Sequence, residues 1–332
     1  MTKEPKIAVI GGGSWATAIA KMLQNNSTNI GWWVRNPDTV EFIKKNHHNP
    51  NYISSVSFEV NKFNVSSNLL EIVENYDILI FAIPSAFLNE QIKTLDFNIL
   101  ENKIIVSAIK GIVPEHNLII GEYFNTKFNI PYDQIAVITG PCHAEEVALE
   151  KLSYLTIACE NQDYAQTIAK AVSCRYIKTN TSDDIFGTEY SAVLKNVIAV
   201  ASGICNGLGY GDNFQAVLIS NAIREIKRYV NKVHPINRDI NDSAYLGDLL
   251  VTAYSQFSRN RTFGNMIGKG YSVKAAQLEM NMIAEGYYAV NCIHQINKTL
   301  GVEMPISEAV YNILYLGKNA RKEIESLSNK LN

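Results

Sequence analysis

Residues 6–23 read KIAVIGGGSWATAIAKML, and this stretch decides the fold. It begins with a short apolar run, Lys6–Ile10, of the kind found in strands, and it ends with the helical spacing of Thr17–Leu23. Between the two lies GGGSWA, which fits the pattern GxGxxA. Such a turn lets the backbone approach a pyrophosphate, which the free N–H groups at the start of the helix can bind. The stretch therefore predicts a dinucleotide-binding turn, with Gly11 and Gly13 as cofactor contacts, rather than a plain tight turn.

Strands and helices continue to alternate through the first half of the chain. Continuous apolar runs, typical of buried parallel strands, occur at Asn29–Val34, Asp77–Ile83, Lys103–Ile109 and Gln134–Thr139, and weaker ones at Leu152–Cys159 and Tyr176–Thr179. Beyond residue 185 almost every segment has helical spacing. The pattern predicts an α/β chain, with an N-terminal Rossmann-type doubly wound parallel sheet in residues 1–185 and an all-helical C-terminal domain in residues 186–332.

Composition limits the classes of function. The chain has 332 residues, 47% hydrophobic and 19% charged, which is enough for two domains with substantial cores. The net charge of -2 gives no general attraction to nucleic acid or to an anionic membrane. No apolar run reaches membrane-spanning length, and the N-terminus lacks the apolar core of a signal peptide. Five scattered cysteines without a CxxC pair suit a reducing cytosol, and the histidine spacing matches no metal site, so we expect a cytoplasmic protein without a metal.

The end of the second predicted strand bears on the choice of cofactor. An NAD-preferring unit of this kind has an acidic residue here to hold the ribose hydroxyls. The sequence instead reads Trp33-Val34-Arg35-Asn36, with no acid before Asp38. Arg35 is placed to meet a 2′-phosphate, so we expect NADP or NAD, with a preference for NADP. A surface arginine at the strand end is the alternative.

The stretch 189–211, EYSAVLKNVIAVASGICNGLGYG, opens the helical half. Its apolar residues follow helical spacing, which predicts a largely buried helix. Inside this pattern is one cation, Lys195, with Asn196 beside it. Small residues three, four and seven positions away share the face of Lys195, so another molecule can come close to the ammonium. A lysine that extends to the surface from an apolar helix is the alternative, and spacing does not decide between the two.

Two further features suit an anionic ligand. Lys110 directly follows a predicted parallel strand, and ligands of open α/β sheets bind at this carboxyl edge. In the helical half, Ser258 is a candidate N-cap for a helix around Phe263–Ile267. The backbone donors of that helix and the Arg259 side chain would then face one anion.

Several short motifs agree in order along the chain, namely GGGSWATA, SAIKG, ITGPCHAEE, LKNVIAVASG, GDLLVT, SRNR and AEG. With a Rossmann half and a helical half, this ordered set resembles the bacterial NAD(P)-dependent glycerol-3-phosphate dehydrogenases over nearly the whole chain. The resemblance implies interconversion of dihydroxyacetone phosphate and sn-glycerol 3-phosphate, which supplies glycerophospholipid synthesis. It also implies a homodimer.

The resemblance assigns site residues as well. The family's cofactor contacts correspond to Ser14, Trp15, Arg35, Lys110, Ala144, Arg259, Ile283 and Glu285. Its substrate contacts correspond to Lys110, Gly140, Cys142, Lys195, Asp248, Ser258, Arg259 and Asn260. There are two departures: Ala16 stands where the family usually has glycine, and Cys142 replaces a serine. A thiol is a much weaker hydrogen-bond donor than a hydroxyl, so that contact is weakened.

The chemistry of ketone reduction gives these residues roles. Lys195 matches the family's catalytic lysine and would give a proton to the developing alkoxide, provided that burial or a neighbouring cation lowers its pKa. Lys110 would be that cation. Asp248 would balance the charge, although a helix N-cap is the alternative role for this aspartate. Arg259 and Asn260 would hold the substrate phosphate.

Three more side chains complete the expected site. Asn196 would orient substrate hydroxyls, with a capping or core amide as the alternative. Thr252, four residues after Asp248 and on the same helical face, would assist. Glu285 would reach the cofactor, with a surface glutamate as the alternative.

Two other functions stay open from the residues. The nearer one is a related two-domain dehydrogenase acting on a β-hydroxyacid, a hydroxyacyl thioester or 6-phosphogluconate. The SRNR segment after GDLLVT favours a small phosphorylated substrate over these. The other is a dinucleotide sensor or scaffold without turnover, and the joint presence of Lys110, Lys195, Asp248 and Arg259 argues against it.

Overall fold

The computed structural model describes residues 5–280 and 284–332. They form two compact units, each with its own hydrophobic core. Unit 1 holds the described residues through Ile83, together with Phe87–Ile109 and Ile120–Ile185. Unit 2 holds the described part of Phe186–Asn332 and two short segments, Pro84–Ala86 and Lys110–Ile119. The expected assignment of residues 1–185 to the cofactor and of 186–332 to the substrate stays a prediction.

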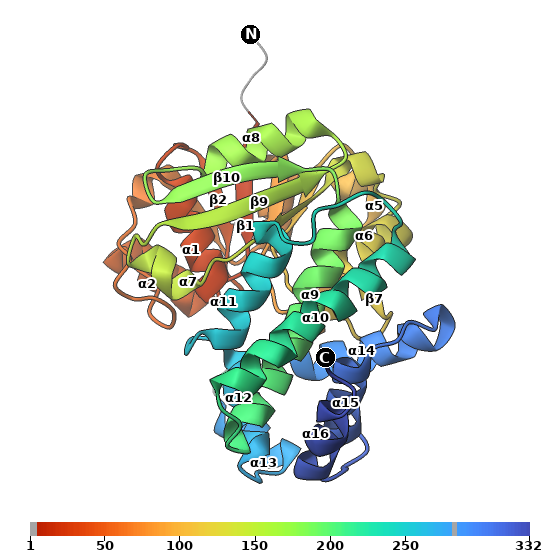
Figure 1. The fold of residues 1–332 in the computed structure, drawn as a ribbon. Coiled ribbons are helices and arrows are strands. Elements are labelled where there is room, and N and C mark those ends of the chain that lie inside the picture. Colours follow the sequence, from red (N-terminus) through yellow and green to blue (C-terminus); the bar gives the residue numbers. More distant parts are fainter. Residues whose placement is uncertain (1–4, 281–283) are drawn as a thin grey trace. The chain divides into compact units, whose positions relative to one another are not determined.

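Unit 1 is built on an eight-stranded sheet with the order β10-β9-β8-β5-β4-β1-β2-β3 (Figure 1). From the centre, the order runs β1-β2-β3 in one direction and β4-β5-β8 in the other, which is the arrangement of a doubly wound sheet and confirms the predicted fold class. The strands are mostly buried apolar runs, and they are β1 (Ile7–Ile10), β2 (Ile30–Trp33), β3 (Phe63–Ser66), β4 (Ile78–Phe81), β5 (Ile104–Ser107), β8 (Ile135–Thr139), β9 (Ser153–Cys159) and β10 (Ile177–Ser182).

The sheet is not parallel throughout, and in this the sequence-based prediction was wrong. β8 and β9 pair in antiparallel fashion, whereas the other neighbouring strands of the sheet are parallel. A parallel neighbour needs a crossover that carries the chain back along the strand. Between β8 and β9, a segment described throughout, the one helix is α7 (Ala144–Ala148), whose 5 residues rise by about 7.5 Å. The 7 residues of β9 span about 23 Å, so α7 is too short to carry the chain back to the other end of the sheet. The chain therefore turns at the same end and β9 runs antiparallel to β8.

Helices cover both faces of this sheet. α1 (Ser14–Leu23) packs against α7 and against α8 (Gln162–Val172), and α8 lies across β9 and β10 (Figure 1). Because the crossovers after β1 and after β4 lead in opposite directions and are right-handed, the helices of these crossovers lie on opposite faces. The other helices of the first half are α2 (Pro37–Asn46), α3 (Leu69–Asn75), α4 (Ser85–Gln91), α5 (Phe97–Leu100) and α6 (Ile120–Phe128).

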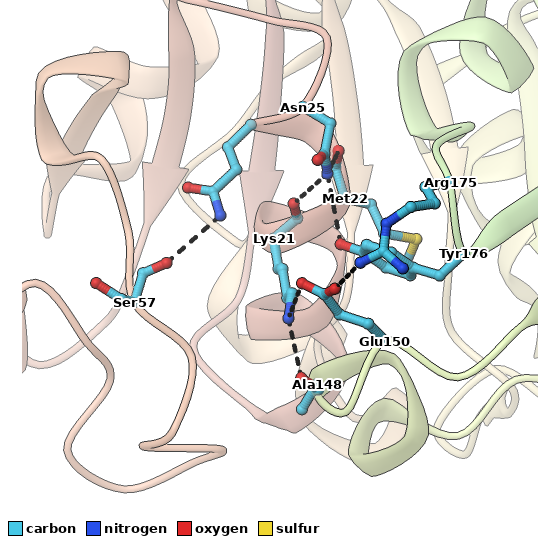
Figure 2. Close-up of polar contacts among 9 residues, drawn as sticks. Lys21, Met22, Asn25, Ser57, Ala148, Glu150, Arg175 and Tyr176 are labelled. Carbon is cyan, nitrogen blue, oxygen red and sulfur yellow. Dashed lines mark hydrogen bonds and ion pairs between the residues drawn. The ribbon is translucent and has the colours of Figure 1, made fainter.

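A buried lysine fastens α1 to the turn that follows α7 (Figure 2). Lys21 is 9% exposed, and its Nζ donates to the carbonyl oxygen of Ala148 at 2.9 Å and lies 3.3 Å from Glu150 Oε1. Arg175 pairs with the same carboxylate, and the Tyr176 ring centre lies 5.5 Å from Lys21 Nζ. The hydrogen bond and the charge of Lys21 hold the pKa of Glu150 below its usual range. Since a buried ammonium needs partners, these contacts keep α7 beside α1.

Two short strand pairings gave no usable signal in the sequence. β3 pairs with β2 at the edge of the sheet, and it reads FNVS, which is too short and too polar to mark a strand. β6 (Ile112–Val113) and β7 (Leu118–Ile119) form a two-stranded antiparallel sheet in unit 2. Neither has enough residues to show a period.

The long apolar helix α9 (Ile185–Gly207) runs through the core of unit 2, as its sequence predicted. α12 (Arg259–Gly268) crosses α9 at close range. If Gly203 of α9 carried a Cβ, that atom would lie only 2.1 Å from the carbonyl oxygen of Arg261 in α12. A Cβ on Gly264 of α12 would likewise lie 2.1 Å from the carbonyl oxygen of Val200 in α9, so only glycine fits at these two positions of the crossing. The other described helices are α10 (Asp212–Val233), α11 (Asp248–Tyr254), α13 (Val273–Glu279), α14 (Glu285–Leu300), α15 (Pro305–Leu314) and α16 (Ala320–Ser328).

Candidate active site

Four side chains of unit 2, Lys110, Lys195, Asp248 and Thr252, form a hydrogen-bonded group that we call the lysine cluster. Lys195 projects from α9, and its Nζ donates to Asp248 Oδ1 at 2.5 Å and to Thr252 Oγ1 at 2.8 Å. Asp248 and Thr252 lie one turn apart on α11, where Thr252 Oγ1 donates to the Asp248 carbonyl at 2.7 Å. All three side chains are buried, so Lys195 is not a lysine that extends to the surface. Gly247, not Asp248, occupies the N-cap position of α11.

Lys110 joins the cluster from the segment after β5. Its Nζ donates to Asp248 Oδ2 at 2.9 Å and to Oδ1 at 3.2 Å, so one carboxylate pairs with two ammonium groups. Asn196, beside Lys195 on α9, donates from Nδ2 to the Lys110 carbonyl at 2.7 Å and fixes this turn. The Lys110 side chain is 18% exposed and that of Lys195 is 6%, so solvent reaches the cluster at Lys110.

Burial and charge set the protonation of the lysine cluster. Burial, the largest cause, and repulsion from Lys110 outweigh the attraction of Asp248 and lower the pKa of Lys195 to about 7. Burial opposes ionisation of Asp248, but Lys110 and Lys195 outweigh it and hold the pKa of Asp248 below its usual range. Asp248 is therefore charged at neutral pH, where Lys195 exists in both protonation states. A lysine of this kind can exchange a proton with a bound substrate.

Three further predicted residues lie at the start of α12, also in unit 2. Ser258 is the N-cap, and its Oγ accepts from the Arg261 N–H at 3.3 Å, as expected. Arg259 is the first helical residue, and it is exposed. Asn260 is buried, and its Oδ1 accepts from the Gly286 N–H at 2.9 Å. Asn260 thus holds the start of α14, a structural contact that its position in SRNR did not indicate.

Glu285 begins α14, and it is not a surface glutamate but a partly buried one. Its Oε1 accepts from the Ser85 N–H at 2.9 Å and its Oε2 from Ser85 Oγ at 2.5 Å. A Cβ on Gly111 would lie 2.4 Å from Ser85 Oγ and 2.7 Å from Glu285 Oε2, so the turn beside Lys110 packs on this pair. Burial raises the pKa of Glu285, while the bonds from Ser85 and the charge of Arg259 oppose the rise. Sequence reasoning missed Ser85, for which Pro84-Ser85 directly after a buried strand was the available signal.

In unit 1 the glycine-rich turn joins β1 to α1. Gly11 has a φ of 142°, and a Cβ there would lie 2.5 Å from the Ala82 carbonyl oxygen, so only glycine fits. Gly13 is the N-cap of α1, which no side chain caps, and no described atom lies within 4 Å of its Cβ position. Ser14 and Trp15 form the first turn, and Trp15 Nε1 is buried with no hydrogen-bond partner among the described residues.

These features of the turn fit the pyrophosphate of a dinucleotide. The first N–H groups of this helix of 10 residues have no side-chain cap, and the Cβ position of Gly13 before them is open; such groups bind anions. Trp15 Nε1 is a buried donor that a bound ligand would satisfy. The residues that would hold the cofactor in unit 1 are therefore Gly11, Gly13, Ser14 and Trp15.

Two side chains that the sequence analysis did not name support the turn. Trp32 Nε1 donates to the Gly11 carbonyl at 2.9 Å. Asn49 donates from Nδ2 to the Gly12 carbonyl at 3.1 Å and to Thr17 Oγ1 at 2.9 Å. Asn49 is fully buried, although the sequence around it, NHHNPNY, is polar. A polar loop carries no local sign of a contact with residues more than 30 positions away.

The other predicted residues of unit 1 lie near strand ends. Arg35 is exposed just after β2, and Gly140, with a φ of 111°, directly follows β8. Because β1, β2 and β8 run in the same direction, these two residues and the glycine-rich turn lie at one edge of the sheet. Cys142 is partly buried ahead of α7, and Ala144 is the first residue of that helix. Ile283 lies outside the described residues.

No helix in residues 5–280 and 284–332 is long and apolar enough to cross a membrane. In these same ranges, no group of three or more His, Cys, Asp or Glu side chains is arranged to hold a metal ion. The candidate residues thus form two groups, one around the glycine-rich turn of unit 1 and one around the lysine cluster of unit 2.

Two family models match the chain. The one described as the NAD-dependent glycerol-3-phosphate dehydrogenase N-terminus matches residues 6–165, and the one described as the C-terminus matches residues 184–325. A glycerol-3-phosphate dehydrogenase (NAD(P)+) of Exiguobacterium sp. is 36% identical over 322 residues, which cover 97% of this chain and 94% of the relative. The enzyme of that name from Bacillus subtilis is 33% identical over 325 residues, which cover 97% of this chain and 93% of that relative.

Solved structures agree with the sequence matches. The crystal structure of glycerol-3-phosphate dehydrogenase from Coxiella burnetii has a TM-score of 0.90 and 27% identity, and the match covers 98% of both chains. The complex of D-mandelate dehydrogenase with NADH has a TM-score of 0.60 and 16% identity, which is a likeness of fold alone. The matches thus favour the predicted substrate over the alternative, a hydroxyacid or another small hydroxy compound.

Proposed function

The chain belongs to the NAD-dependent glycerol-3-phosphate dehydrogenase family, and on that premise we propose that it interconverts dihydroxyacetone phosphate and sn-glycerol 3-phosphate with NAD(P)H. In the reducing direction the ketone gains a hydride and a proton and becomes a secondary alcohol, while the nicotinamide is oxidised. The observation that supports this chemistry best is the buried Lys195, which pairs with Asp248 at 2.5 Å and has a pKa of about 7.

Lys195 is the proton donor in this proposal. Its protonated amine gives a proton to the alkoxide oxygen as the carbonyl carbon is reduced, and in the reverse direction the neutral amine removes it. Asp248 holds the amine in place and stays charged throughout. Lys110, the more exposed member of the lysine cluster, polarises the carbonyl and keeps the pKa of Lys195 low. Thr252 accepts a bond from the Lys195 amine and fixes its direction.

The start of α12 suits the phosphate of the substrate. Arg259 is exposed there and can form two parallel bonds to a phosphate. Ser258 caps the helix, and the N–H groups of its first turn lie next to Arg259 in the chain, where they would add donors for the same anion. Asn260 keeps this segment in place through Gly286, and Asn196 would orient the hydroxyl groups. Gly140 and Cys142 are proposed as substrate contacts from unit 1.

Cofactor binding is assigned mainly to residues 1–185 and substrate binding to residues 186–332. When bound, the reduced nicotinamide supplies the hydride. Gly11, Gly13 and the start of α1 bind the pyrophosphate, and Arg35 meets a 2′-phosphate, which favours NADP over NAD. The remaining proposed contacts are Ala144, Lys110, Arg259, Ile283 and Glu285.

The direct test is an assay of the purified protein that follows the absorbance of NADPH or NADH. We expect oxidation that depends on dihydroxyacetone phosphate and yields sn-glycerol 3-phosphate. Oxidation with a β-ketoacid instead would indicate the related dehydrogenase. Binding of NADPH with no turnover of any of these substrates would indicate a sensor, and either result would reject the proposal.

We also propose that the protein is a cytoplasmic homodimer that supplies sn-glycerol 3-phosphate to glycerophospholipid synthesis. Family membership supports both statements. Light scattering in solution should give twice the mass of one chain, and the mass of one chain would reject the dimer. Cell fractionation should place the protein in the soluble cytoplasmic fraction.

A further inference from the structure

We propose that Ser85 is a positioning residue of the active site, which holds the Glu285 side chain as a hydrogen-bond-accepting carboxylate beside the Lys110–Gly111 turn. This inference rests on the proposed function, because it assigns Glu285 to the cofactor. The contacts themselves lie within unit 2 and join residues 200 positions apart.

The geometry of the pair is specific. Ser85 is fully buried, and it presents its N–H and its Oγ–H to the two oxygens of one carboxylate, at 2.9 and 2.5 Å. The backbone of Gly111 packs directly on both partners, since a Cβ there would lie within 2.7 Å of each. Gly286, the next residue of α14, packs against the Asn196 carbonyl, where its Cβ would lie at 2.6 Å. Ser85 thus holds the Glu285 side chain, and the contact of Gly286 holds the start of the helix that carries it.

The bond from Ser85 also has a chemical effect. A carboxylate accepts hydrogen bonds, as the ribose hydroxyls or the amide group of the cofactor require, whereas a protonated carboxyl also donates. Burial raises the pKa of Glu285, and the two bonds from Ser85 and the charge of Arg259 oppose that rise. The Cys292 thiol, two turns along α14, also interacts electrostatically with Glu285, but burial raises the pKa of this thiol to about 11, so it is neutral at working pH. Without the Ser85 hydroxyl, Glu285 would take up a proton at higher pH.

The same kind of contact occurs a second time in unit 2 and serves as a matched control. The buried Glu225 of α10 accepts from the Ile306 N–H at 2.8 Å, the Ser307 N–H at 2.9 Å and Ser307 Oγ at 2.6 Å. Ser307 is in the first turn of α15 and touches none of the proposed site residues through these bonds. Ser307→Ala therefore removes an equivalent hydrogen bond where no cofactor contact is assigned.

The experiment measures the dissociation constant of NADPH by protein fluorescence between pH 5 and 9, for wild type, Ser85→Ala, Ser85→Thr, Glu285→Gln and Ser307→Ala. Wild-type affinity should weaken as the pH falls and Glu285 becomes protonated. Ser85→Ala should move the midpoint of this loss up by about one pH unit, the value expected for one hydrogen bond to a charged group. Ser85→Thr, which keeps a hydroxyl, should restore the wild-type midpoint. Glu285→Gln should bind NADPH more weakly, and its affinity should not change with pH in this way.

Ser307→Ala should lower the melting temperature yet keep the wild-type midpoint. An unchanged midpoint in folded Ser85→Ala would overturn the inference, as would a midpoint that persists in Glu285→Gln. If Ser85→Ala does not fold, Glu285→Gln still tests the inference, because it shows whether Glu285 is the group that titrates. A failure of the proposed function would show differently, as normal NADPH binding without turnover of dihydroxyacetone phosphate.

Discussion

The Nζ of Lys195 lies 2.5 Å from Oδ1 of Asp248, and both side chains are buried although their residues are 53 positions apart in the chain. The same carboxylate also binds Lys110, so two cations share one anion. Burial of Lys195 and its repulsion by Lys110 outweigh the attraction of the shared carboxylate, which is why the pKa of Lys195 falls to about 7.

Replacing Lys195 by methionine should abolish turnover. Methionine is an unbranched side chain one atom shorter than lysine and has no acidic proton to give, so kcat should fall by about 10²–10⁴, the usual contribution of general acid catalysis. NADPH affinity should stay near that of wild type, because the glycine-rich turn is in unit 1. The exposed Lys298 offers the control Lys298→Met, which should be neutral. A kcat within about tenfold of wild type would remove Lys195 from this role.

The pH profile of ketone reduction should respond in opposite directions to two substitutions in the lysine cluster. Reduction needs protonated Lys195, so wild-type kcat/KM should fall as the pH rises through about 7. Asp248→Asn removes the attraction that holds the proton and should move this limb to lower pH. Lys110→Met removes the repulsion and should move it to higher pH. Profiles that shift in the same direction would contradict the charge balance described here.

Arg259→Ala should weaken binding of the substrate phosphate. Loss of a bidentate contact between two charged groups is worth about 1.5–3 kcal/mol, so the KM for dihydroxyacetone phosphate should rise by roughly ten- to a hundredfold. Arg321→Ala, at an exposed arginine of α16, is the control and should leave KM as it is. Steady-state kinetics decide the matter, and unchanged KM and kcat in Arg259→Ala would reject the assignment.

Cofactor preference should depend on Arg35. If its side chain meets a 2′-phosphate, Arg35→Ala should lower kcat/KM for NADPH by about tenfold or more and leave NADH nearly unaffected. Lys45→Ala, at an exposed lysine of the neighbouring α2, should change neither value. The ratio of the two kcat/KM values is the measurement, and a ratio that Arg35→Ala does not alter would rule out this contact.

Lys21→Met should destabilise unit 1. The partly buried Ala148 carbonyl loses a hydrogen bond from a charged group, which is worth about 1.5–3 kcal/mol, and α7 loses its tie to α1. Arg175 contacts the same Glu150 from an exposed position, so Arg175→Gln should have little effect. Urea unfolding followed by circular dichroism gives the two free energies of unfolding. Equal stabilities of the two variants would show that the buried contact contributes nothing.

Local features of the chain were sufficient to predict the fold class and to single out several candidate site residues. The apolar runs of the strands and the GxGxxA turn are set by neighbours along the sequence, and the structure has both. The pattern around Lys195 likewise identified a buried helix with one cation. The antiparallel β9 was not predictable in this way, because strand direction depends on the path of the connection rather than on the strand itself.

By itself, the sequence determined the longer apolar strands and the main helices, where the glycine-rich turn lies, and that a lysine interrupts the apolar helix α9. Only the tertiary structure decided what that lysine touches and how Ser85 meets Glu285. These partners are 53 and 200 positions apart. Periodicity reports the face of an element but not the element that packs on it, and a pKa depends on all the charges and the burial around a group in space.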